Sequence, residues 1–204
     1  MTEYSVRRLP VQHIEREAFA KFGTLIAPET ADSPRLNRAP GHFGYLWVQK
    51  ELEFPKTAYM CALRYYHRGT RCEFLQKHPA STIVLIAMGA GASVFYAAPD
   101  DGHDHPDVDE AQAFLLRASQ GIVLHRGIWV RYAYPVGEFS DFAYVTQRVD
   151  PATANSTDDV VRSNLDKDFG IVLEASLDPA PGAPFEFGPS GAVVSGPPRH
   201  PPSD

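Results

Sequence analysis

The chain has 204 residues, with 19 Lys and Arg against 25 Asp and Glu, a formal net charge of −6 at pH 7. A hydrophobic fraction of 44% and a charged fraction of 22% are typical of one globular domain that can bury its own core. The acidic balance argues against a nucleic-acid partner, and no apolar run approaches the roughly 20 residues of a membrane-spanning helix. We therefore expect a small-molecule substrate, no nucleic acid and no membrane.

Residues 11–26, VQHIEREAFAKFGTLI, predict a short N-terminal helix that follows a strand-like opening. The apolar residues recur at helical spacing, at Ile14, Ala18, Phe19 and Phe22. Gly23 follows them, and glycine commonly stands where a helix ends.

From Leu46 onward, short β-rich segments alternate with turns that are rich in Gly, Pro and Asp. The segments that we predict as strands are 45–54, 57–67, 81–89, 92–99, 112–118, 121–135 and 139–149. This spacing is typical of a sandwich or a barrel, so the architecture should be mainly antiparallel β.

The acidic stretch 98–111, APDDGHDHPDVDEA, contains His103 and His105 in a pattern that a metal-binding tract would also show. Its Pro, Gly and Asp content favours a solvated hairpin loop, in which carboxylates and imidazoles need no partner. We therefore predict no metal ion there.

Two further features indicate the compartment and the domain boundary. Cys61 and Cys72 lack the spacing of a zinc site, and we interpret them as reduced core thiols rather than a disulfide. The first ten residues lack an apolar signal segment, so we expect a soluble cytoplasmic protein. Residues 1–177 should form the domain, and the Pro- and Gly-rich residues 178–204 a disordered tail.

Three clusters together resemble one known family in order and spacing. They read RLPVQHIEREAFAKFGTLI near the N-terminus, EFLQKHPASTIVLIAMGAG at 73–91, and QGIVLHRGIWV at 120–130 followed by SDFAYV at 140–145. Over about residues 8–150, this pattern is similar to the ureidoglycolate lyase family. The resemblance implies a cupin-like double-stranded β-helix, which is an antiparallel β-barrel, assembled as a homodimer and needing no cofactor.

The activity that the resemblance implies is cleavage of ureidoglycolate into glyoxylate and urea, a step of allantoin and purine catabolism. Ureidoglycolate is a carbinolamine. Removing its hydroxyl proton therefore collapses it to an aldehyde and expels urea, if a second group protonates the departing nitrogen. Such a site needs a base, an acid and a cation for the carboxylate.

His78 and His125 match two histidines of the family, and imidazole suits acid and base chemistry near neutral pH. The resemblance therefore implies that they are the catalytic pair, although each could instead be a hydrogen-bonded histidine of the barrel. The residues implied in substrate binding are Arg64, Arg126, Gln76, Ser81, Trp129 and Asp141. Either Arg64 or Arg126 could hold the carboxylate bidentately, or be a solvated strand residue.

Two of these assignments have equally simple structural readings. Trp129 fits a packing role at the mouth of a barrel better than a chemical one. Asp141 could orient a histidine or anchor a strand.

The positions that carry the metal ligands of metal-binding cupins fall on Gln76, His78, Ile83 and Val130. Only His78 is a good ligand, so we predict no metal in the barrel. Ile83 and Val130 also make this wall of the cavity more apolar than the family pattern. Desolvating polar substrate groups without partners costs roughly 1–3 kcal/mol each.

Three functional hypotheses follow from this pattern. The first is a metal-independent carbon–nitrogen lyase that acts on ureidoglycolate. The second is a diverged cupin enzyme, a lyase, isomerase or cyclase, that acts on a larger and more apolar metabolite. The third is a small-molecule-binding barrel without catalysis, since a fold does not fix a function.

Overall fold

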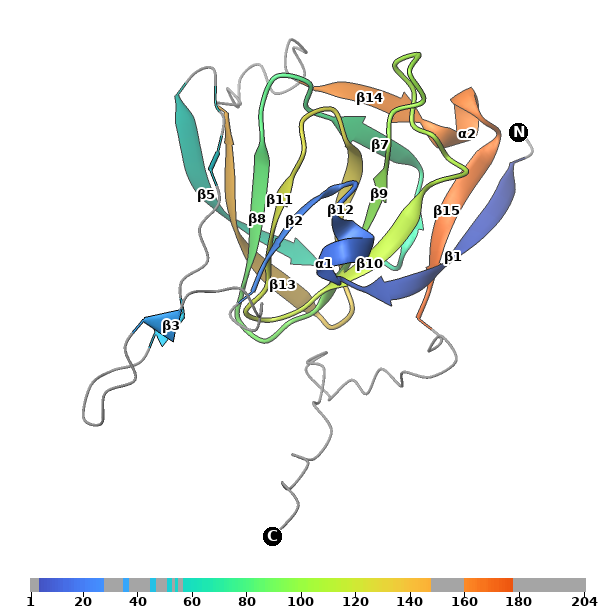
Figure 1. Ribbon diagram of the computed structural model, residues 1–204. Helices are drawn as coiled ribbons and strands as arrows, with labels where there is room; N and C mark the ends of the chain where they lie inside the picture. Colours follow the sequence, from blue (N-terminus) through green and yellow to red (C-terminus); the bar gives the residue numbers. More distant parts are fainter. Residues whose placement is uncertain are drawn as a thin grey trace, which may run out of the picture.

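The computed structural model describes residues 4–27, 35–36, 45–46, 51–52, 54, 57–147 and 160–177. Two curved sheets, of eight and five strands, enclose a common interior (Figure 1). A separate two-stranded ribbon consists of β3 (Arg35–Leu36) and β4 (Tyr45–Leu46). The two helices of the described residues are one turn each, α1 (Arg16–Phe19) and α2 (Leu165–Asp168).

The eight-stranded sheet contains both parallel and antiparallel pairs. Its order is β14 (Val161–Asn164), β7 (Phe74–Lys77), β12 (Trp129–Pro135), β9 (Ser93–Ala98), β10 (Gln112–Leu116), β1 (Ser5–His13), β15 (Ile171–Ser176) and β6 (Arg71–Cys72). Strand β1 pairs in parallel with both β10 and β15, and the remaining pairs are antiparallel.

The five-stranded sheet is antiparallel throughout. Its order is β2 (Gly23–Ile26), β11 (Gly121–Leu124), β8 (Ile83–Met88), β13 (Phe139–Gln147) and β5 (Ala58–Tyr66). These findings confirm the prediction of a mainly β barrel whose strand pairs are mostly antiparallel, with a short N-terminal helix.

The core has two parts because strand side chains alternate between the two faces of the eight-stranded sheet. Val130 and Tyr132 point into the interior between the sheets, whereas Trp129 and Tyr134 of the same strand pack into a second core. Four phenylalanines fill part of the interior between the sheets, with neighbouring ring centroids 5.2 to 6.0 Å apart: Phe19, Phe22, Phe95 and Phe114.

The helix predicted within residues 11–26 is shorter than its apolar spacing indicates. Residues 11–13 belong to β1 and lie opposite β10, and residues 23–26 form β2 opposite β11. Backbone pairing with these strands overrides the local periodicity, so only Arg16–Phe19 remain helical.

The predicted strand 121–135 is two strands in different sheets. Strand β11 ends at Leu124 and β12 begins at Trp129, so residues 125–128 form the turn that crosses between the sheets. Gly127 has a φ of +79°, a left-handed conformation that glycine adopts at little cost.

The other predicted segments have different outcomes. Strands lie within 57–67, 81–89, 92–99, 112–118 and 139–149, as predicted. Only Tyr45–Leu46 of the segment 45–54 is described as a strand, and the proposed tail 178–204 lies outside the described residues. Cys61 and Cys72 are both free thiols, and no helix among the described residues is long and apolar enough to cross a bilayer.

Candidate active site

The turn between β11 and β12 is fastened to the end of β7 by one backbone hydrogen bond. The Gly127 N–H donates to the His78 carbonyl oxygen at 3.2 Å. The backbones of the two predicted catalytic histidines, His78 and His125, are therefore brought to the same end of the barrel. Arg126 lies between His125 and Gly127 and is exposed.

The His125 ring has a defined tautomer in this arrangement. Its Nε2 lies 3.1 Å from the Ala20 carbonyl oxygen, and its backbone N–H donates to the Phe22 carbonyl at 2.9 Å. A carbonyl oxygen can only accept a hydrogen bond, so Nε2 carries the proton and Nδ1 of the neutral ring carries the lone pair. An exposed imidazole in this tautomer can take a proton through Nδ1.

His78 and Ser81 lie in the segment between β7 and β8, and both are buried. The His78 side chain is buried, with 4% of the residue exposed. Ser81 is 1% exposed, and its Oγ has no hydrogen-bond partner among the described residues. Ser81, which we predicted to bind substrate, is therefore a buried residue whose hydroxyl group is available to form a hydrogen bond.

The residues at the positions of cupin metal ligands line the interior between the sheets. Val130 lies directly opposite Gln76 in the pairing of β12 with β7, so both residues share one face of the sheet. Ile83 is 3% exposed and Val130 is fully buried in the same core. This part of the interior is as apolar as predicted, apart from the Gln76 amide.

Two buried tyrosines, however, supply polar atoms to the interior. The phenol oxygens of Tyr132 and Tyr144 are 3.0 Å apart, and the Gln76 side chain contacts Tyr132. Burial and the neighbouring Tyr144 raise the pKa of Tyr132 well above its usual value. Both groups are hence neutral phenols near neutral pH, able to donate hydrogen bonds.

Trp129 is directed away from this interior and into the second core. Its indole N–H donates to Asp100 Oδ2 at 3.0 Å, and the Lys77 ammonium lies 4.8 Å from its ring centroid. Lys77 also bonds to the carboxylates of Asp100 and Asp104. This arrangement favours the packing role for Trp129.

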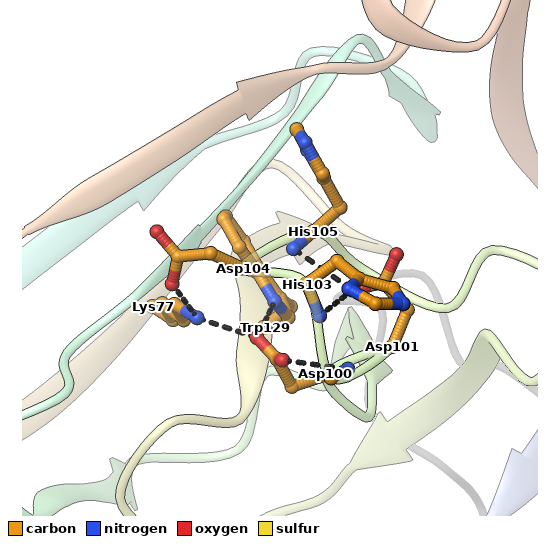
Figure 2. Close-up of polar contacts among 8 residues, drawn as sticks. Lys77, Asp100, Asp101, His103, Asp104, His105 and Trp129 are labelled. Carbon is orange, nitrogen blue, oxygen red and sulfur yellow. Dashed lines mark hydrogen bonds and ion pairs between the residues drawn. The ribbon is translucent and has the colours of Figure 1, made fainter.

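The loop 98–111 is hydrogen-bonded, so the expectation that its charged groups need no partner is wrong. Besides the two carboxylates that bind Lys77, Asp101 Oδ1 accepts the backbone N–H groups of His103 and His105, at 2.7 and 3.1 Å (Figure 2). Aspartate side chains commonly accept hydrogen bonds from backbone N–H groups a few residues further along the chain, and these bonds stabilise a turn. Among the described residues, no three His, Cys, Asp or Glu side chains are grouped to hold a metal ion.

Arg64 and Asp141 form a bidentate ion pair on the outer face of the five-stranded sheet. Arg64 Nε and Nη2 donate to the two carboxylate oxygens at 2.7 and 2.8 Å, and the guanidinium also stacks on Phe139. The neighbours Phe142 and Tyr144 point inward, so Asp141 points outward. The structure therefore does not bring this pair together with the histidines.

Comparison with known proteins identifies the family. A model described as ureidoglycolate lyase matches residues 6–170. The chain belongs to the ureidoglycolate lyase family. Curated relatives include ureidoglycolate lyases of Pseudomonas paraeruginosa, 24% identical over 69% of this chain and 83% of the relative, and of Escherichia coli, 25% identical over 66% and 84%.

Two solved structures are similar to about half of the chain. One is RmlC from Streptococcus suis in complex with dTDP-D-xylose, with a TM-score of 0.38, 10% identity and 48% of each chain covered. The other is oxalate decarboxylase of Bacillus subtilis, with a TM-score of 0.36, 16% identity, and 55% of this chain and 25% of that chain covered.

Within this member of the ureidoglycolate lyase family, sequence reasoning missed two groups of residues. The Tyr132–Tyr144 pair joins strands of different sheets, and a single sequence carries no signal for such a contact. Arg131 and Arg162, from β12 and β14, both stack on Phe74, and an isolated arginine in a strand gives no indication of what it faces.

Proposed function

We propose that the protein is a metal-independent carbon–nitrogen lyase that converts ureidoglycolate into glyoxylate and urea. The observation that carries this proposal is the family match over residues 6–170, which includes residues of both sheets and both histidines. The donor set at the cupin metal positions supports a route without a metal, because Gln76, Ile83 and Val130 offer no carboxylate or imidazole.

His78 and His125 are the proposed acid and base. His125 takes the substrate hydroxyl proton through Nδ1, because its Nε2–H is held by the Ala20 carbonyl. The freed electron pair forms the aldehyde carbonyl and the carbon–nitrogen bond breaks. His78 then gives a proton to the departing urea nitrogen, which completes the elimination.

The test is the release of glyoxylate and urea from ureidoglycolate by the purified full-length protein. General acid–base groups contribute about 10²–10⁴-fold each, so His125→Ala and His78→Ala should each reduce kcat by at least about a hundredfold. His103→Ala, on the exposed loop, is the matched control and should retain full activity. Glyoxylate release no faster than the spontaneous reaction would refute the proposal.

A second candidate function is favoured by Ile83 and Val130. These residues are almost completely buried and place hydrocarbon where metal-binding cupins carry polar ligands. Such a wall suits a larger, more apolar metabolite for a lyase, isomerase or cyclase reaction. This alternative predicts no acceleration of ureidoglycolate cleavage, and the non-catalytic alternative predicts that His78→Ala and His125→Ala leave ligand affinity unchanged.

We further propose that the protein is a cytoplasmic homodimer. The outer face of the five-stranded sheet carries exposed apolar side chains on β5 and β8: Met60, Tyr66, Ile86 and Met88. An exposed apolar patch of this kind suits burial against a second copy of the chain, and the Arg64–Asp141 pair provides charges of both signs within it.

A further inference from the structure

One carboxylate oxygen in the loop 98–111 bonds to residues of two different strands. Asp100 Oδ2 accepts the Trp129 indole N–H at 3.0 Å and also accepts a hydrogen bond from the Lys77 ammonium (Figure 2). Lys77 is the last residue of β7, and Trp129 is the first residue of β12. The Asp100 carboxylate therefore joins the end of one strand to the beginning of its neighbour in the sheet.

These two strand ends lie next to the proposed catalytic histidines in the chain. His78 directly follows Lys77. Trp129 directly follows Ile128, whose N–H donates to the His125 carbonyl oxygen at 3.4 Å. A second hydrogen bond of this turn ends on the His78 carbonyl oxygen. The shared carboxylate thus restrains the backbone beside both histidines.

The loop that carries Asp100 is closed by backbone pairing across its base. Asp100 forms an antiparallel bridge with Pro106, and the Asp107 N–H donates to the Pro99 carbonyl oxygen at 2.9 Å. Strand β9, which leads into the loop, pairs directly with β12. The carboxylate is therefore attached to a backbone with a defined conformation, as a group that positions other residues requires.

The two donors to this carboxylate are deeply buried. Lys77 is 5% exposed and Trp129 is fully buried. A lysine is almost never buried unless its charge is paired, and here the carboxylates of Asp100 and Asp104 pair with it. Apolar residues of similar volume often stabilise a fold as well as a buried ion pair does, but they form no directional bonds. The network is therefore better suited to fixing a geometry than to adding stability.

We propose that Asp100 is a positioning residue that holds His78 and His125 in their reactive arrangement. It acts through Lys77 on the segment of His78, and through Trp129 on the turn that begins with His125. Displacing a reacting group by about 1 Å can lower a rate on the order of a hundredfold. The catalytic role of the histidines rests on the proposed function, whereas their position can be measured without any substrate.

The test is a histidine side-chain NMR spectrum of the substrate-free, full-length protein, with the two imidazoles assigned from His78→Ala and His125→Ala. Trp129→Phe removes the indole N–H but keeps an aromatic ring, and should shift the His125 imidazole signals more than those of His78. Lys77→Met removes the ammonium and should have the opposite preference. Asp100→Ala, which removes both effects of the carboxylate, should shift the signals of both imidazoles.

Asp101→Ala is the matched control in the same loop, because Asp101 accepts the backbone N–H groups of His103 and His105. It should leave both imidazole signals unchanged, and shifts as large as those of Asp100→Ala would overturn the assignment to Asp100. Thermal unfolding of each variant measures the effect on the fold. If Asp100→Ala only lowers the unfolding temperature and leaves both imidazole signals in place, the proposal is also overturned.

Turnover of ureidoglycolate distinguishes this proposal from the proposed function. Trp129→Phe and Asp100→Ala should each lower kcat about tenfold or more, with a much smaller change in KM, because substrate contacts remain. Shifted imidazole signals in a protein that does not cleave ureidoglycolate reject the lyase reaction alone. Cleavage by Asp100→Ala at the rate of the unaltered protein rejects the positioning role alone.

Discussion

At the scale of single residues, the hydrogen bond between the Tyr132 and Tyr144 phenols is a buried polar contact on which the stability of the fold depends. Tyr132 and Tyr144 are 5% and 8% exposed, and their oxygens bond to each other inside an apolar core. A buried donor that loses its partner retains the cost of desolvation, which is about 1–3 kcal/mol. Their hydrogen bond therefore couples the two sheets at one point.

We expect Tyr144→Phe to lower the free energy of unfolding by about 1–3 kcal/mol, because it removes the oxygen that accepts the hydrogen bond of the buried Tyr132 phenol. Urea denaturation measures this change. Tyr66→Phe removes a hydroxyl from a residue that is 65% exposed, and should change stability by less than about 0.5 kcal/mol. Equal effects of the two substitutions would contradict a structural role for the pair.

The residue scale also includes a pH-dependent contact, between Lys77 and Asp100. Burial alone would raise the pKa of the Asp100 carboxyl, but hydrogen bonds from Lys77 and Trp129 outweigh it and hold this pKa below its usual value. A carboxyl with a lowered pKa in the folded state stabilises the fold above its unfolded pKa of about 3.9, and this contribution is lost as pH falls through the folded value.

Asp100→Asn should therefore destabilise the protein at pH 7, and the difference from the unaltered protein should shrink below about pH 4. Denaturation midpoints over a pH series measure it. Asp109→Asn, in the exposed ion pair with Arg7, serves as the control and should show a much smaller difference at every pH. A gap between Asp100→Asn and the unaltered protein that stays constant down to pH 3 would argue against this coupling.

At the scale of elements, the turn at residues 125–128 positions the proposed base. Gly127 has a positive φ, and a Cβ added there would meet no atom within 4 Å, so a substitution costs backbone strain without a clash. Its N–H also bonds to the His78 carbonyl. Strain at this residue would thus be transmitted to both histidines.

Gly127→Ala should destabilise the fold by about 1 kcal/mol and also lower kcat. Gly102→Ala is a closely matched comparison, because Gly102 has a φ of +84° and is equally open, but lies in the loop 98–111. It should lose similar stability and keep its kcat. Urea denaturation and glyoxylate release measure the two effects, and an equal loss of kcat in both variants would refute a positioning role for the turn.

The elements that sequence reasoning predicted well are strands with a clear alternation, such as β13, whose buried and partly exposed residues alternate from Ser140 to Val145. The helix over 11–26 was overpredicted because residues 11–13 and 23–26 pair with neighbouring strands, which leaves only the segment between them free to be helical. A family motif is what makes His78 and His125 the proposed catalytic pair. The position of Arg162 opposite Gln76 was missed because the sequence of β14 does not specify its partner strand, β7.

At the scale of the whole molecule, the proposed dimer interface is the outer face of the five-stranded sheet. We expect the protein to sediment as a dimer, and Ile86→Glu, which places a charge in the middle of this face, to shift it to a monomer. Analytical ultracentrifugation measures the mass. Val6→Glu, at an exposed apolar residue of the other sheet, should leave the dimer intact, and a dimer that survives Ile86→Glu would exclude this face.

The position of β1 in the eight-stranded sheet constrains the order of events during synthesis. Residues 5–10 pair with residues 171–176, and the same strand pairs on its other side with residues 113–115 (Figure 1). Parallel contacts of such sequence separation form late, since a long loop must close first. During synthesis, residues 5–10 of β1 therefore keep one unpaired edge until β15 has emerged, and an unpaired strand edge can pair with other chains in the meantime.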